Sequence, residues 1–276
     1  MSAAPAGDEA RALEVAERAA RNAGELLLGY LGRLDPEAMR RKSSVRDLVT
    51  EADVESERLI VSALREAFPE DAIEAEEEVL DARDSDDDPR PRWFLDPLDG
   101  TVNFVHGLPA FAVSIGRYVA GEPRTAVVHV PRLDETFTAN AGAGAFLNGK
   151  PLRVSDTAEL SEAVLATGFP YRRGELEHDN LANFQGFFYD VRGMRRFGSA
   201  AIDLAYTAAG RFDGYWELHL SPHDVAAGAL LVCEAGGIVT DPDGGENWLR
   251  GGHIVAAGPA LQPLIRARVV HGPTAH

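Results

Sequence analysis

Hydrophobic residues at helical spacing predict two helices in the first quarter of the chain. Residues 8–31 carry an apolar stripe that predicts an amphipathic helix, with a buried face of Ala12, Val15, Ala16, Ala19, Ala23, Leu26, Leu27 and Tyr30. A second helix is expected just after Thr50, because Thr50 and Asp53 have the spacing of a capping box. Its buried stripe would be Leu59, Ile60, Ala63, Leu64 and Ala67, and it would end by Phe68-Pro69.

The pattern changes to short β-rich runs between residues 111 and 147. Residues 111–119, 125–130 and 135–139 read as strands, and the segments between them are rich in glycine and proline. Closely spaced strands with short turns predict a mostly antiparallel meander.

After Val154, strands and helices alternate. The pattern predicts strands at 163–167, 215–216, 238–240 and 254–257, and helices near 179–185, 200–209, 222–235 and 260–268. The helix at 222–235 has a proline near its first turn and Gly236-Gly237 just past its end. Helices that cover two successive sheets in one compact unit are the expected architecture.

Composition narrows the possible partners and location. With no signal peptide and no long apolar run, the chain is expected in the cytoplasm, and the single Cys233 excludes an intramolecular disulfide and is expected to be buried in its helix. A net charge of −17 argues against a general nucleic-acid or membrane binder, but a metal ion can still attract a small phosphorylated substrate locally. The acidity, with Lys42 and Lys150 as the only lysines, fits a salt-adapted host or a GC-rich genome equally well.

The acidic residues between 82 and 91 form a polar segment with no apolar period. They look at first like a calcium-binding loop, but the required glycine and terminal glutamate are missing. A solvated surface insertion is the expected structure.

The segment Trp93 to Phe104 holds the most informative chemistry. An apolar run ends in a turn with Asp96 and Asp99 three residues apart, and Gly100-Thr101 follows where a helix could begin. Either aspartate alone is an ordinary turn residue. Together with the Leu98 carbonyl they offer hard oxygen ligands for a cation, beside free backbone N–H groups for a phosphate.

Other carboxylates have simple structural explanations when taken one at a time. Glu76 belongs to a glutamate run, which is usually a solvated face, and Asp224 stands in the first turn of a predicted helix. Asp53 is explained by the helix cap. Only the order of the motifs around them indicates that Asp53, Glu76 and Asp224 belong to one site.

That order resembles the inositol monophosphatase family, a group of magnesium-dependent, lithium-sensitive phosphomonoesterases. The resemblance rests on residues 42–53, Glu76-Glu77, residues 96–104 and residues 224–228, with smaller matches at 104–109, 142–149 and 198–201. It extends from about residue 10 to residue 268, which is nearly the whole chain.

The resemblance implies an α/β (α+β) fold, a layered αβαβα sandwich of the sugar-phosphatase type that is usually homodimeric. Residues 1–276 would form one inositol-monophosphatase-like domain. Its N-terminal α+β half, about residues 8–155, would contain the metal site, and residues 156–270 would form a C-terminal α/β half.

The resemblance also implies two or three Mg²⁺ ions in each site. Glu76, Asp96 and the Leu98 carbonyl would hold one, Asp96, Asp99 and Asp224 would hold a second, and a weaker third would lie near Glu76. Thr101 and Asp53 would activate the attacking water, with Glu76 nearby. Substrate contacts would come from Asp99, Gly100, Thr101, Ser199, Ala200, Glu217 and Asp224.

The implied activity is that of a phosphoric monoester hydrolase acting on a small phosphorylated metabolite, with inositol 1-phosphate first. Histidinol phosphate, fructose 1,6-bisphosphate and a nucleotide phosphate stay open, and residues 171–190, with Arg172 and Arg173, are where the choice is expected. A regulatory, protein-binding member of the family is the alternative from a different class. One departure from the family is His223, which stands where many members have tryptophan and is expected to pack or hydrogen-bond.

Overall fold

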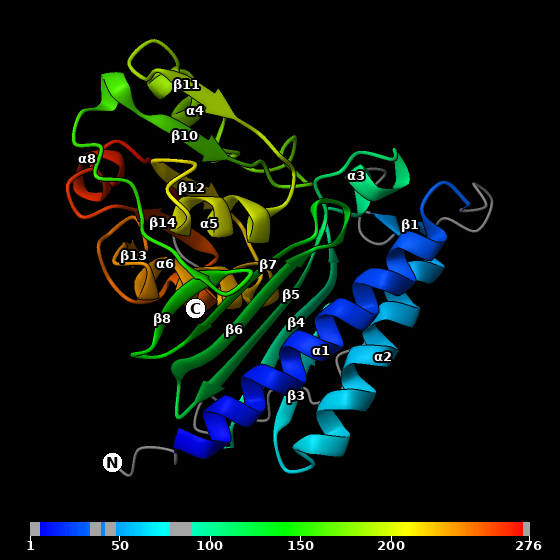
Figure 1. The fold of residues 1–276 in the computed structure, drawn as a ribbon. Coiled ribbons are helices and arrows are strands. Elements are labelled where there is room, and N and C mark those ends of the chain that lie inside the picture. The colour runs from blue at the N-terminus through cyan, green and yellow to red at the C-terminus, as the bar shows by residue number, and fades with distance from the viewer. Residues whose placement is uncertain (1–5, 34–39, 42–47, 78–89, 273–276) are drawn as a thin grey trace.

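The computed structural model describes residues 6–33, 40–41, 48–77 and 90–272 (Figure 1). Most of the predicted surface insertion at 82–91 and most of the motif at 42–53 that precedes Thr50 therefore lie outside the described residues. Within the described ranges, none of the helices combines the length and apolar character needed to cross a membrane.

A seven-stranded sheet forms the larger half of the structure. Its strands follow chain order as β3 (Ala72–Ala75), β4 (Arg92–Asp99), β5 (Ala112–Val119), β6 (Glu122–Val130), β7 (Glu135–Asn140), β8 (Gly144–Leu147) and β9 (Lys150–Pro151). β3 and β4 are parallel, and every later neighbour is antiparallel, which confirms the predicted meander. Glu122 and Pro123 were expected in a turn, but β6 already begins at Glu122. The turn is made instead by Ala120 and Gly121, whose positive φ angles of 54° and 81° suit a tight hairpin.

A second, five-stranded sheet has the order β11 (Gly193–Arg195), β10 (Val164–Thr167), β12 (Gly214–Leu218), β14 (His253–Ala257) and β13 (Ile238–Thr240). β10 runs parallel to β11 and β12, whereas β14 is antiparallel to both of its neighbours. The sequence pattern did not predict β11, a short strand at the edge of this sheet. β1 (Arg40–Arg41) and β2 (Leu48–Val49) form a separate antiparallel pair.

Helices cover and separate the two sheets, giving five layers (Figure 1). α1 (Ala6–Tyr30) and α2 (Glu51–Ala67) pack on one face of the larger sheet, and α5 (Ala200–Ala208) and α6 (Pro222–Glu234) lie between the sheets. α4 (Leu181–Phe188) and α8 (Gln262–Arg266) pack on the outer face of the smaller sheet. α3 (Thr101–Val105) and α7 (Trp248–Gly251) are short, and the 3-10 turns are η1 (Pro131–Leu133) and η2 (Leu160–Glu162). The predicted layered αβαβα sandwich is therefore confirmed.

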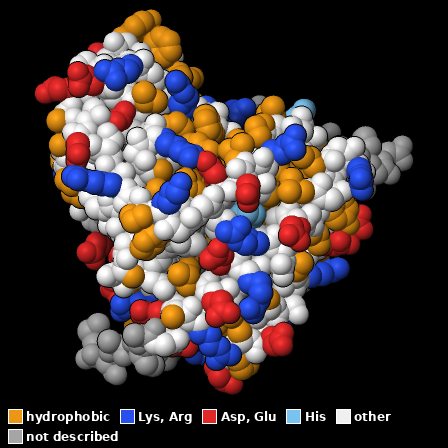
Figure 2. Space-filling view, viewed as in Figure 1, with side chains coloured by type: hydrophobic (Ala, Val, Ile, Leu, Met, Phe, Trp, Pro, Cys, Tyr) orange, Lys and Arg blue, Asp and Glu red, His pale blue; other side chains and the backbone are white. Residues whose placement is uncertain are grey.

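The position of each helix in the layers follows from its sequence. α1 is amphipathic, and its outer face carries the ion pairs Glu14–Arg18 and Glu17–Arg21, four residues apart. Figure 2 shows acidic and basic side chains interspersed over this part of the surface. α6, by contrast, is buried along Val225–Val232, as expected of a helix between two sheets. Gly116 on β5 lets α6 approach closely, because a Cβ there would lie 3.0 Å from the Ala227 nitrogen.

Candidate functional site

A β-bulge brings Asp96 and Asp99 to the same side of strand β4. Asp96 pairs with Ser114 and Asp99 with Ala112, so three steps along β4 match two steps along β5. In a regular strand, side chains three residues apart point to opposite faces, and the extra residue removes that difference. Both aspartates are buried, with exposed fractions of 2% and 8%.

Glu76 joins them through the parallel strand β3. Ala75 pairs with Leu95, so the residues that follow, Glu76 and Asp96, come side by side at the carboxyl ends of two neighbouring strands. A hydrogen bond and the charge of Glu76 both act on Asp96. The edge of the sheet therefore carries three of the predicted carboxylates.

Asp224 reaches the same corner from the start of α6. It occupies the third position of the helix and closes a capping box with Ser221, whose backbone N–H donates to Asp224 Oδ2 at 2.6 Å. Ser114 Oγ donates to the His223 carbonyl at 3.4 Å and ties this helix start to β5. One carboxylate oxygen each from Asp96, Asp99 and Asp224 lies within 4.8 Å of the others, which makes the group able to hold a metal ion.

The charges at this corner are mutually unfavourable. Burial is the largest cause that raises the pKa of Asp96, and the neighbouring carboxylates Glu76, Asp99 and Asp224 raise it further. Burial and the charge of Asp224 also raise the pKa of Asp99 to about 8, although hydrogen bonds from Ser199 and Ala201 oppose the shift. A divalent cation would supply the positive charge that this set of oxygen donors lacks, so the donor set fits a hard metal ion.

Asp53 and Thr101 form a buried hydrogen-bonded pair behind the carboxylates. Thr101 Oγ1 lies 3.0 Å from Asp53 Oδ1 and 3.1 Å from the Leu98 carbonyl, and its single proton serves one of these acceptors at a time. Asp53 Oδ2 is held by both the hydroxyl and the backbone N–H of Thr50. Burial raises the pKa of Asp53 to about 6, against the hydrogen bonds from Thr50 and Thr101.

Gly100 and Asn103 fix the turn between β4 and α3. Gly100 has a φ of 94°, and a Cβ there would lie 2.9 Å from the Ala110 carbonyl oxygen. Only glycine meets both conditions without strain. Asn103 Nδ2 donates to the carbonyls of Ala110 and Phe197, at 2.6 and 2.7 Å, and so joins this turn to the chain that leads into α5.

The N-terminus of α5 is built around Asp99. Ser199 caps the helix and its hydroxyl donates to Asp99 Oδ2 at 2.7 Å, while the Ala201 N–H donates to the same oxygen at 2.7 Å. Ser199 and Ala200 are buried, with exposed fractions of 2% and 7%. The predicted residues 199–200 therefore lie at the site, but the Ser199 hydroxyl already binds Asp99.

Glu217 on β12 and Asp203 on α5 add two more buried acids. Tyr215 donates a hydrogen bond of 2.7 Å to Glu217, yet burial still raises the pKa of Glu217 to about 7. Burial also raises the pKa of Asp203, helped by the charges of Glu217 and Asp99, and within the described ranges its Oδ1 has no hydrogen-bond partner. Asp203 was not predicted, because a carboxylate inside an apolar helix gives no motif.

A cavity of about 290 Å³ lies beside the carboxylates of Asp99, Glu217 and Asp224. Its walls include six predicted residues, namely Glu76, Asp99, Ser199, Ala200, Glu217 and Asp224. Asp96, Leu98, Gly100, Thr101 and Asp53 are not among its lining residues. The lining also includes Tyr171, Arg196 and His219, which no motif had singled out individually.

Two residues singled out in the sequence lie at the rim. His223 lines the cavity with its Nε2 3.8 Å from Asp224 Oδ1. Arg173 lines an adjoining cavity of about 720 Å³, which shares Phe169, Tyr171, Arg196 and Gly198 with the first. The region expected to select the substrate therefore borders the site.

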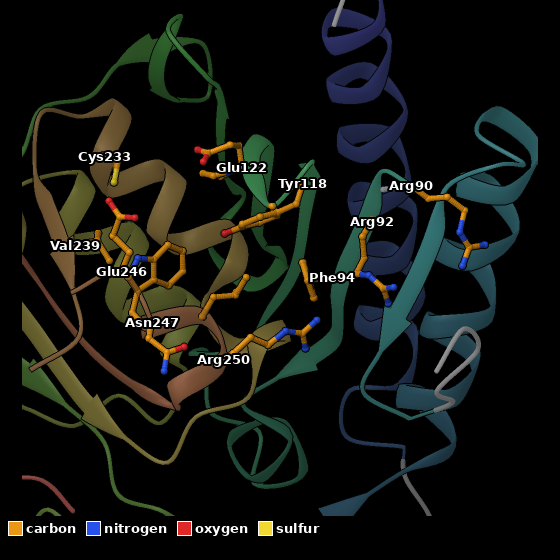
Figure 3. A pocket seen from close by; sticks show the side chains of 14 residues that line it. Arg90, Arg92, Phe94, Tyr118, Glu122, Cys233, Val239, Glu246, Asn247 and Arg250 are labelled. Atoms are coloured by element: carbon orange, nitrogen blue, oxygen red, sulfur yellow. The ribbon is translucent and has the colours of Figure 1, made fainter. Parts of the chain in front are cut away.

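The prediction that Cys233 is buried is wrong. Cys233 is exposed, because the packed part of α6 extends only to Val232. It lines a third cavity, of about 510 Å³, together with Tyr118 and Arg250 (Figure 3). Asp96, Asp99 and Asp224 are not among the lining residues of this cavity.

Fold and site together define the class of protein. Residues 8–272 match the model of the inositol monophosphatase family, and the chain belongs to that family. Membership supports phosphatase activity.

The chain is also similar to individual members of this family. It is 48% identical to the Nus factor SuhB of Pseudomonas aeruginosa over 248 residues, covering 88% of this chain and 90% of that protein. Among solved structures, the extragenic suppressor protein suhB of Bartonella henselae has a TM-score of 0.84 and 38% identity, covering 95% of this chain and 99% of the other. The inositol monophosphatase of Anabaena (Nostoc) has a TM-score of 0.82 and 41% identity, covering 93% and 94%.

Proposed function

We propose that this protein hydrolyses a small phosphate monoester, similar to inositol 1-phosphate, to the alcohol and inorganic phosphate in a magnesium-dependent reaction. The observation that carries the proposal is the group Asp96, Asp99 and Asp224, whose oxygens lie within 4.8 Å of one another beside a cavity. Family membership supports the same class of reaction.

The proposed metal ligands are all oxygen donors. Asp96, Asp99 and Asp224 would hold one Mg²⁺, and Glu76, Asp96 and the Leu98 carbonyl a second, so that Asp96 contacts both; a weaker third ion would lie near Glu76. Bound magnesium lowers the pKa of a coordinated water and neutralises charge on the attacking and leaving oxygens. Magnesium prefers carboxylates and carbonyls to nitrogen or sulfur, and these ligands match that preference.

Thr101 and Asp53 would accept the proton of the attacking water. When Thr101 Oγ1 donates to Asp53 Oδ1, its lone pairs are free to accept a hydrogen bond from a water in the site. As the water oxygen forms its bond to phosphorus and the bond between phosphorus and the ester oxygen breaks, the water proton would pass to Thr101 and the Thr101 proton to Asp53. The leaving alkoxide would take a proton from solvent and depart as the alcohol. Because the pKa of Asp53 is raised to about 6, its carboxylate is a better proton acceptor than an ordinary aspartate.

The remaining residues would bind the substrate. Backbone N–H groups of Gly100 and Thr101 would contact the phosphate, and Glu217, Ser199 and Ala200 the alcohol. Ser199 also holds Asp99 in place through its hydroxyl.

The size of the cavity favours a small substrate. Sites for drug-sized ligands typically occupy roughly 300–1,000 Å³, and this cavity has about 290 Å³. A polyol or sugar monophosphate is of a size that fits this space, and a nucleotide would also need the adjoining cavity of about 720 Å³. Histidinol phosphate stays an alternative, and fructose 1,6-bisphosphate would extend its second phosphate toward Arg173 and Arg196.

A second candidate function is a regulatory, protein-binding role, alone or beside catalysis. It is supported by the Pseudomonas aeruginosa relative, which is named a Nus factor. Retention of Asp53, Glu76, Asp96, Asp99, Thr101 and Asp224 favours catalysis over a purely regulatory role. A cytoplasmic homodimer is part of the same proposal.

A phosphate-release screen tests the function. The purified chain is incubated with a panel of phosphorylated metabolites, with and without magnesium and lithium. We expect magnesium-dependent, lithium-inhibited release, fastest with inositol 1-phosphate. Absence of magnesium-dependent release from every compound would contradict catalysis and leave the regulatory role.

A further inference from the structure

A histidine cluster borders the cavity at the end of β12. His219 lines the cavity, His253 begins β14, and His271 lies near the end of the described chain. The ring centroids of His219 and His253 are 4.9 Å apart, and those of His253 and His271 are 5.6 Å apart. His178 joins the cluster through its carbonyl, which lies 2.8 Å from His219 Nε2.

His253 has an unusual hydrogen-bonding arrangement. Its side chain is buried, with an exposed fraction of 2%, and its Nδ1 accepts the backbone N–H of His219 at 3.1 Å. A ring nitrogen that accepts a hydrogen bond carries no proton, so neutral His253 has its hydrogen on Nε2. That Nε2 is buried and has no hydrogen-bond partner among the residues that the structure describes. A buried donor without an acceptor costs folding free energy, so an imidazole at this position calls for an explanation beyond stability.

The bond from His219 to His253 holds the connection between β12 and α6. His219 has a φ of 62°, a left-handed conformation that is unfavourable for a residue with a side chain. Leu220 N–H donates to the Gly252 carbonyl at 2.8 Å, directly beside His253. The connection therefore depends on residues 252–253 for two successive hydrogen bonds.

This connection joins two walls of the cavity. Glu217 precedes it on β12, and Ser221 and Asp224 follow it at the start of α6. A shift of residues 219–221 would change the distance between Glu217 and Asp224. The ring of His253 thus binds the segment that connects the two carboxylates.

We propose that His253 is a positioning residue for the reaction, and that it holds the 219–221 connection in place only while its imidazole is neutral. The proposal rests on the proposed phosphatase function. Protonation adds a hydrogen to Nδ1, so that two N–H donors face each other and the bond from His219 is lost. The connection then loosens and the cavity loses its geometry.

The groups around His253 set the pH at which this occurs. Burial lowers the pKa of His253, and the charges of His219 and His271 lower it further, whereas the Gly252 backbone and the charge of Asp241 oppose the shift. Asp243 contacts His271 Nε2 at 3.3 Å and is the next charge outward. His253 is therefore neutral at neutral pH, and the connection loosens only as the pH falls below the ordinary histidine value of about 6.5.

Two variants distinguish positioning from packing. Asparagine places its amide near the position of Nδ1, so His253→Asn keeps an acceptor for the His219 N–H but does not titrate. Glutamine places its amide near Nε2, so His253→Gln has similar polarity without that acceptor. At pH 8 we expect H253N to retain kcat/KM within about threefold of wild type and H253Q to lose about tenfold, roughly one hydrogen bond.

The ratio of wild-type to H253N kcat/KM is then measured from pH 8 to pH 5 in saturating magnesium. The metal-site carboxylates titrate in both proteins, so their effect on kcat/KM cancels in the ratio. We expect the ratio to fall as the pH drops below about 6.5, by at most the tenfold loss expected for H253Q, and amide hydrogen exchange in residues 218–224 to accelerate in wild type but not in H253N, after correction for intrinsic rates. A ratio independent of pH, or equal exchange in the two proteins, overturns the proposal. The exchange experiment needs no turnover, so it decides the matter even if the chain releases no phosphate.

Discussion

The two ends of strand β4 both bury carboxylates, but they neutralise them differently. Near the start of β4, Asp71 accepts hydrogen bonds from Arg117 and Trp93, at 2.8 and 2.9 Å. Glu74 binds both terminal nitrogens of Arg250, at 2.6 and 2.8 Å. Each of these acids has an arginine beside it.

At the other end of the same strand, each carboxylate has further carboxylates as its neighbours. Asp96, Asp99 and Asp224 share one corner, and the charged groups that shift the pKa of Asp96 are themselves carboxylates. An arginine beside Asp96 and Asp99 would stabilise the folded protein, as Arg117 and Arg250 do beside Asp71 and Glu74 near the start of β4. Arginine partners therefore distinguish the start of β4 from its acidic end, where a divalent cation is the counter-charge that we propose.

Replacing one acid at each end should separate these roles most strongly. Asp96→Asn removes the ligand proposed to contact both metal ions, and we expect magnesium-dependent turnover to fall about a thousandfold or more. Because the change also removes repulsion between buried carboxylates, metal-free D96N should be at least as stable as wild type. Phosphate release and urea denaturation measure the two effects.

Asp71→Asn is the matched control at the paired end. It leaves Arg117, whose side chain is 3% exposed, with Asp8 as its remaining acid partner. We expect a loss of about 3 kcal/mol in the free energy of unfolding, with turnover of the folded protein retained. The proposed difference between the two ends of β4 would be wrong if D96N lost stability but kept turnover and D71N lost turnover but kept stability.

The Thr101–Asp53 pair gives a smaller but specific effect at the acidic end of β4. Thr101→Val keeps the shape of the side chain and removes the hydroxyl, and we expect turnover to fall about a hundredfold or more. Thr101→Ser restores the hydroxyl and should recover most of the rate. Equal rates for the valine and serine variants would exclude a role for the hydroxyl in proton transfer.

The acidic end of β4 should also make metal-free stability depend on pH. The folded-state pKa of Asp99 is raised to about 8 from an ordinary value of 3.8, so the folded state binds more protons than the unfolded state between these values. Its contribution to stability is therefore present at low pH and lost as the pH rises toward 8. In EDTA we expect the melting temperature to fall between pH 6.5 and 8.5, above the range where His129 and His253, whose pKa values are lowered, titrate. The fall should be shallower in Asp99→Asn, and an unchanged slope in that variant would contradict the assignment.

Arg250→Lys should have the smallest effect. Lysine keeps the charge but loses the two parallel hydrogen bonds to Glu74, and its ammonium cannot stack over the Phe94 ring as the guanidinium does, 5.0 Å from the centroid. We expect a loss of about 1 kcal/mol in the free energy of unfolding and no change in magnesium affinity. A change in magnesium affinity would show that the two ends of β4 are coupled.

The sequence predicted the layers and many of the carboxylates, because both leave local patterns. Helical stripes, the antiparallel meander and the Asp96–Thr101 turn can each be recognised within a few residues. The bulge in β4 has no such signal, since it depends on how β5 pairs with it. Arg196 and His219 line the cavity from positions just after strands β11 and β12, and no short motif encodes that placement. Cys233 was predicted wrongly because the apolar pattern of α6 continues beyond the part that is covered.

Magnesium titration by calorimetry tests the central claim, that the acid corner of β4 is a divalent-cation site. Wild type should bind magnesium and release protons, because binding displaces them from carboxylates of raised pKa, so the measured heat should vary with the ionisation enthalpy of the buffer. D96N should show no binding in the same concentration range, and D71N should bind as wild type does. Equal magnesium binding by wild type and D96N, or none by wild type, would contradict the account.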